Sequence, residues 1–141
     1  MNDESVKLIR ENVEYLRDKK PSEILNWAAK HPREIKHIVG RLNDFECGYC
    51  AKGILGQVAY LTHFGNTSYY SKGTDIIPES FNPQLDIKYM YHIKNGVPLE
   101  DVKYPLSDEE LRLINLTIVK MNDVDNANLG MIAKYLESVG L

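Results

Sequence analysis

The stretch from Cys50 to Leu61 constrains the fold more than any other part of the chain. Its apolar side chains recur every three or four residues, as they do along one face of an α-helix. They are Cys50, Ile54, Val58 and Leu61, with Ala51, Leu55 and Ala59 beside them. A helix that is apolar over so much of its surface is stable only when other elements cover it. We therefore expect residues 50–61 to form the central helix of the fold.

Five further segments carry apolar residues at helical spacing and are expected to surround this helix. They are approximately residues 3–19, 22–30, 32–42, 107–122 and 126–139. Pro21 and Pro32 separate the first three segments, because proline cannot continue a helix from its interior. Ser107 and Glu110 have the spacing of a capping box, which predicts that the fourth helix begins there.

The middle of the chain is less regular. Residues 66–82 are polar and are expected to form one long irregular loop. The next segment fits a helix from Asn82 to Asn95, which we favour, but a β-hairpin over residues 87–104 stays open because apolar residues also alternate there before Asn95-Gly96. The sequence thus predicts a mostly α fold. We expect a compact bundle of about six or seven helices, forming a single domain over residues 1–141.

Composition excludes several classes of protein. Hydrophobic residues make up 43% of the chain and its formal net charge is −3, which is typical of a globular domain. A dedicated nucleic-acid-binding protein usually carries a basic excess, so a nucleic-acid partner is not expected. No apolar run is long enough to span a bilayer. Residues 1–5 are polar and acidic and do not resemble a secretory signal, so we expect a cytoplasmic protein.

The motif Cys47-Gly48-Tyr49-Cys50 is the most specific local feature, and it has three interpretations. A redox pair would resemble thioredoxin-like proteins, but the βαβ framework of those proteins is missing. A zinc site with His63 is hindered by distance, because about 18 Å of helix separates Cys50 from His63 at 1.5 Å per residue. The simplest interpretation is that the two thiols pack at the start of a core helix. We expect no metal and no cofactor.

A catalytic role for Cys50 is an alternative. A thiol nucleophile needs a histidine within hydrogen-bond reach to activate it. The sequence does not show which histidine lies close to Cys50. The candidates are His31, His37, His63 and His92.

Two groups of residues are candidates for contact with a partner or ligand. Arg33, Lys36, His37 and Arg41 fall on one side of the helix predicted for residues 32–42, where they suit an acidic partner or a phosphate. A solvated outer face is the simpler explanation of that pattern. Tyrosine is favoured at binding surfaces and also packs beneath loops. The tyrosines near the predicted loop are Tyr69, Tyr70, Tyr89 and Tyr91.

Three short segments, Cys50–Leu55, Met121–Asp123 and Ile132–Glu137, resemble a pattern in small uncharacterised bacterial and phage proteins. Those proteins carry Cys-Ala-x-Gly-Ala-Leu early and Asn-Asp before a final helix. The resemblance implies an α-rich fold and says nothing about mechanism. Our leading hypothesis is a small intracellular binding or regulatory module, phage or mobile-element encoded, that acts through a protein partner or a small ligand. The alternatives are a cysteine-dependent enzyme, using Cys50 or the pair of Cys47 and Cys50, and a minor phage structural component.

Overall fold

The described part of the chain is mostly helical, as the sequence predicts. A computed structural model describes residues 3–38, 43–44, 48–51, 53–55, 58, 61 and 106–141. Its helices are α1 (Asp3–Glu11), α2 (Val13–Arg17), α3 (Pro21–Ala29), α7 (Asp108–Asp123) and α8 (Leu129–Ser138). Residues 51, 53–55, 58 and 61 are helical as well. Two short strands, β1 (Asn43–Asp44) and β2 (Gly48–Tyr49), pair in antiparallel fashion between the N-terminal helices and this segment.

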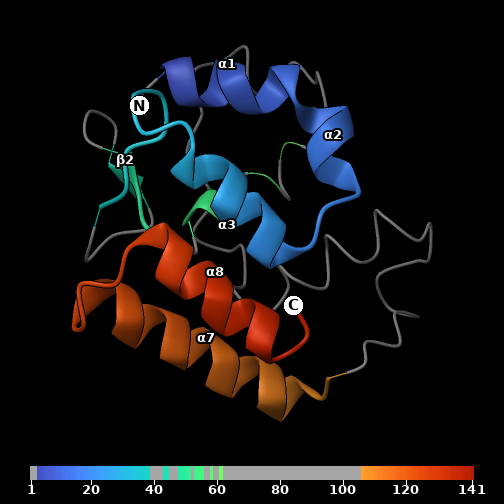
Figure 1. The fold of residues 1–141 in the computed structure, drawn as a ribbon, viewed down its shortest axis with the longest axis vertical. Helices are drawn as coiled ribbons and strands as arrows, with labels where there is room; N and C mark the ends of the chain where they lie inside the picture. The colour runs from blue at the N-terminus through green and yellow to red at the C-terminus, as the bar shows by residue number, and fades with distance from the viewer. Residues whose placement is uncertain are drawn as a thin grey trace.

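The core lies where α3 packs on α8, the most extensive contact between the elements described. Figure 1 shows α8 lying between α3 and α7. Leu25 of α3 and Ile132 and Leu136 of α8 are fully buried in this core. The helical segment of residues 51–61 belongs to the same core, since Ile54, Leu55, Val58 and Leu61 are each at most 2% exposed. The predicted central helix is therefore confirmed at the positions described.

The prediction of one continuous helix over residues 3–19 is wrong. The helix ends at Glu11 and a second helix begins at Val13. The side-chain amide of Asn12 donates to the carbonyl of Leu8 at 2.8 Å, and the backbone N–H of Asn12 bonds instead to Ile9. A short polar side chain that occupies a helical carbonyl in this way competes with the regular backbone ladder.

The prediction of a helix over residues 32–42 is also wrong for residues 32–38. Residues 32–34 form a turn, closed by the hydrogen bond from the Ile35 N–H to the His31 carbonyl at 2.9 Å, and residues 36–38 are not helical, with His37 in a β-bridge. The chain then leaves the helical path, and the Ile38 carbonyl accepts a hydrogen bond from the side chain of Asn122. This hydrogen bond to a residue far away in the sequence, which the spacing of apolar residues does not predict, forms here in place of the expected helix.

The C-terminal helices begin at capped ends. Ser107 Oγ accepts from the Glu110 N–H at 3.1 Å and Glu110 Oε1 accepts from the Ser107 N–H at 3.2 Å, which confirms the predicted capping box. The last helix begins later than expected, at Leu129, because Asn128 Oδ1 accepts from the Met131 N–H at 2.8 Å. Within the ranges described, no helix combines the length and the apolar character that crossing a membrane requires.

Candidate functional site

Asn122, near the C-terminal end of α7, is a buried polar side chain with every hydrogen-bonding position occupied. It is 2% exposed. Its Oδ1 accepts from the Ala51 N–H at 3.1 Å and contacts Nε2 of His37. Its Nδ2 donates to the Ile38 carbonyl at 3.0 Å and to Asp123 Oδ1 at 2.8 Å. An asparagine amide has two donor hydrogens and two acceptor lone pairs, so this side chain is fully satisfied.

The Asn122 amide joins three segments that are far apart in sequence. Residues 37–38 come after the turn that follows α3, Ala51 begins the central helical segment, and Asn122 itself lies in α7. A fully paired buried amide fixes the relative position of the groups that it bonds, because breaking any one bond leaves a buried group unsatisfied. The Asn122 side chain thus fixes the start of the central helix and residues 37–38 relative to one another, as one unit.

Cys50 immediately precedes this unit and its side chain is buried, at 8% exposed. The sulfur accepts from the Gly53 N–H at 3.4 Å, and the Cys50 carbonyl accepts from the Ile54 N–H at 3.0 Å. The Cys50 carbonyl thus accepts the first backbone bond of the helix, while its sulfur and Asn122 Oδ1 accept from the Gly53 and Ala51 N–H groups, which have no backbone partner inside the helix. The thiol therefore acts as a helix cap.

A cysteine, a histidine and an asparagine, the three groups that papain-like hydrolases use, approach one another here. His37 contacts the Asn122 side chain directly, and Ala51, the residue after Cys50, donates its N–H to the same side chain. The sulfur, however, accepts from the Gly53 N–H, and the imidazole is bonded to Asn122. The sulfur and Nε2 of the imidazole thus each have a hydrogen-bond partner other than one another in this arrangement. His31 packs against Trp27, with ring centroids 4.9 Å apart, and His63 and His92 lie outside the described residues.

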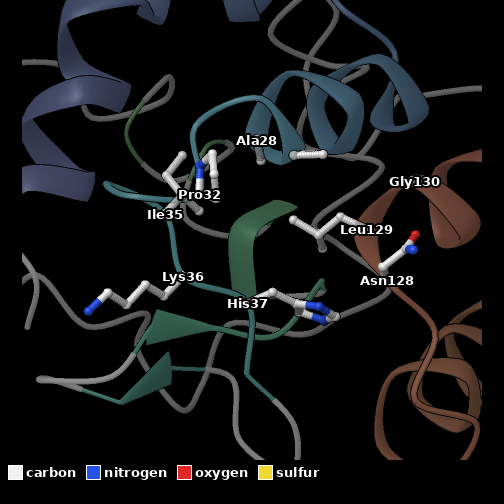
Figure 2. Close-up of a pocket in the computed structure, with 9 residues that line it drawn as sticks. Ala28, Pro32, Ile35, Lys36, His37, Asn128, Leu129 and Gly130 are labelled. Atoms are coloured by element: carbon white, nitrogen blue, oxygen red, sulfur yellow. The ribbon is translucent and has the colours of Figure 1, made fainter.

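A cleft of about 720 Å³ opens beside His37, between the end of α3, the segment that follows it and the start of α8 (Figure 2). Its walls are mainly apolar and are formed in part by Ala28, Pro32, Ile35 and Leu129. His37 comes from the segment after α3, and Asn128 lies at the start of α8. This volume falls within the range of about 300–1,000 Å³ that is typical of small-molecule sites.

The structure describes three of the residues predicted to contact a partner or ligand. Lys36 and His37 line the cleft, and Arg33 is exposed in the same segment. None of the three lies on a helix, so the predicted basic helical face is wrong for these residues. Six further residues singled out in the sequence lie outside the described part of the chain: Arg41, Cys47, Tyr69, Tyr70, Tyr89 and Tyr91.

Asn122 and Asn128 were not among the predicted ligand-contact residues. One sequence signal was present for Asn122, which continues the buried stripe of Leu111, Ile114 and Ile118 along α7. A polar residue on a buried stripe requires internal hydrogen-bond partners, and that requirement alone marks it for attention.

A metal centre would need several ligating side chains close together. Among the residues that the structure describes, no group of three or more histidine, cysteine, aspartate or glutamate side chains is assembled. Cys47 and His63, which the zinc interpretation of the Cys47–Cys50 motif would also require, lie outside those residues.

The burial of Cys50 predicts slow reaction with thiol reagents. In a Cys47→Ser variant, Cys50 should label on the order of a hundredfold more slowly at neutral pH than in denaturant, because the reagent reaches it only when the structure opens locally. Labelling followed by mass spectrometry measures both rates. Labelling as fast in the native protein as in denaturant would instead indicate an accessible, reactive thiol and would favour the cysteine-dependent enzyme.

Comparison of this chain with models of protein families, with curated proteins and with solved structures finds no match. The resemblance to small bacterial and phage proteins, and a phage or mobile-element origin, therefore stay predictions from the sequence.

Proposed function

We propose that the protein is a cytoplasmic binding module whose ligand is a small molecule held in the cleft beside His37. The observation that carries this proposal is the cleft itself. Its walls are mainly apolar, and polar groups are limited to a few positions that include Lys36, His37 and Asn128. An apolar pocket with a few converging polar groups is the usual form of a small-molecule site.

The surroundings of the cleft support binding because its walls are fixed in place. On one side, the segment that carries His37 is tied to α7 through Asn122. On the other, the first turn of α8 is capped by Asn128. A site whose walls are already ordered avoids part of the entropic cost of binding.

A substitution that fills the cleft tests this proposal. Ala29 is exposed and lines the cleft, so Ala29→Phe should occupy part of the space without disturbing the core. Compounds from a small-molecule library that stabilise the wild-type protein should lose most of that effect in Ala29→Phe. A compound present at a hundred times its Kd adds about 2.7 kcal/mol of stability, which thermal melting detects readily.

Lys134→Phe is the matched control, because Lys134 is exposed on α8 and does not line the cleft. Both variants gain the same aromatic side chain, but only Ala29→Phe should abolish stabilisation. If the active compounds stabilise Ala29→Phe as strongly as wild type, the ligand binds elsewhere and the proposal is wrong.

A second candidate function is a cysteine-dependent enzyme, because His37 and Asn122 lie at the start of the helix that Cys50 caps. This function requires the Cys50 sulfur to leave the Gly53 N–H and turn toward the imidazole. The labelling experiment on Cys50 distinguishes it from a binding module.

A further inference from the structure

The hydrogen bonds of Asn122 determine which nitrogen of His37 carries the hydrogen. The amide of Asn122 can be oriented in only one way, because Ala51 presents an N–H donor to it and Ile38 presents a carbonyl acceptor. Exchanging the oxygen and nitrogen of the amide would place donor against donor and acceptor against acceptor. Oδ1 therefore faces both Ala51 and His37, and an amide oxygen can only accept. Nε2 of His37 must donate to it.

The consequence is that a neutral His37 presents a hydrogen-bond acceptor at its other nitrogen. When Nε2 carries the hydrogen of a neutral imidazole, Nδ1 carries a lone pair. His37 lines the cleft, whereas Asn122, which holds Nε2, does not. Nδ1 is thus the polar atom of the ring left for a molecule in the cleft.

The rest of the cleft favours an uncharged ligand. Figure 2 shows the ammonium of Lys36 pointing away from His37 and Leu129. On the α8 side, Asn128 uses its Oδ1 to cap the helix, which leaves the hydrogens of its Nδ2 to donate. Apolar side chains that include Ile35 and Leu129 line the remainder. A hydroxyl group, which both donates and accepts, suits these two polar positions on an otherwise apolar molecule.

We propose that the cleft selects uncharged, mainly apolar molecules that donate a hydrogen bond, such as that of a hydroxyl group, to Nδ1 of His37. Asn122 is the positioning residue, because it holds Nε2 and so determines the tautomer. This inference rests on the proposed function and specifies the class of ligand that the cleft takes.

The tautomer is measured without any ligand. Nitrogen-15 NMR of the histidine side chains in the wild-type protein should show neutral His37 with its hydrogen on Nε2. A hydrogen on Nδ1, or rapid exchange between the two nitrogens in the wild-type protein, would overturn the inference.

Phenol and anisole are matched probes for the ligand class, because anisole replaces only the hydroxyl hydrogen with a methyl group. Binding is followed by the methyl signals of Ile35 and Leu129 in the intact protein. Phenol should bind about three- to tenfold more tightly than anisole, the range expected for one hydrogen bond. His37→Gln should remove that difference, because the glutamine amide can replace the Nε2 donor to Asn122 without providing an acceptor at the position of Nδ1.

The outcomes separate the two proposals. Equal binding of phenol and anisole to the wild-type protein would overturn the ligand class and leave the cleft as a binding site. The same would follow if His37→Gln folded normally and retained the full preference for phenol. If neither probe shifts the signals of Ile35 and Leu129, the cleft is not a small-molecule site, and both proposals fail.

Discussion

Replacing Val58 with aspartate should prevent the chain from folding cooperatively. Val58 is 1% exposed and belongs to the main hydrophobic core, on the same helical face as Ile54 and Leu61. A carboxylate there loses its hydration among apolar side chains, at a cost of several kcal/mol. A domain of this size is stable by only about 5–15 kcal/mol, so one such substitution removes most or all of its stability. Circular dichroism during thermal melting measures the loss.

Leu116→Asp is the control for this effect. Leu116 lies on α7 and is 54% exposed, so the same charge introduced there remains hydrated. We expect this variant to fold and to lose no more than about 1 kcal/mol, as is usual for exposed positions. Similar melting of the two variants would mean that Val58 is not in the core and that the central helix faces another way.

The core could be predicted from the sequence because it depends on local spacing. Apolar residues at intervals of three and four identify the buried faces of the segment of residues 51–61 and of α8, and the structure buries those faces. The capping box at Ser107 is equally local, since both partners lie within four residues. Patterns of this kind require no knowledge of the tertiary fold.

The errors have a common physical cause, which is competition from side-chain hydrogen bonds to the backbone. At Asn12 the competing bond is local, to the Leu8 carbonyl, and it divides the first helix. At Ile38 it is tertiary, because the donor is Asn122 of α7. Apolar spacing over residues 32–42 is compatible with a helix, but it carries no information about a partner more than eighty residues away.

The candidate cleft could not be predicted for the same reason. Its walls come from residues 28–37 and 128–130, which the contact between α3 and α8 brings together. His37 attracted attention in the sequence as one of four histidines, and only the structure shows that Asn122 holds it at the cleft. Lys36, singled out for its charge, lines the cleft with its ammonium directed away from His37 and Leu129.

Asn122→Ala should be the most damaging substitution of a polar side chain in the described part of the protein. It removes four hydrogen bonds and leaves the Ala51 N–H and the Ile38 carbonyl without the partner that satisfies them. Buried polar groups left in this state cost about 1–3 kcal/mol each, so we expect a total loss of about 2–6 kcal/mol for the two. Urea denaturation followed by circular dichroism measures the change in the free energy of unfolding.

Asn115→Ala is a closely matched control, because Asn115 lies on the same helix and is also buried, at 7% exposed. The chemical change is identical, but Nδ2 of Asn115 has no hydrogen-bond partner among the residues that the structure describes. Removing an unsatisfied amide relieves its desolvation cost, which offsets much of the packing lost, so the stability should change by no more than about 1 kcal/mol. Equal losses in the two variants would show that side-chain volume, and not the hydrogen bonds of Asn122, holds the end of α7 to the start of the central helix. A larger loss for Asn122→Ala would establish that these bonds hold His37 and Ala51 together, and with them the wall of the cleft that carries His37.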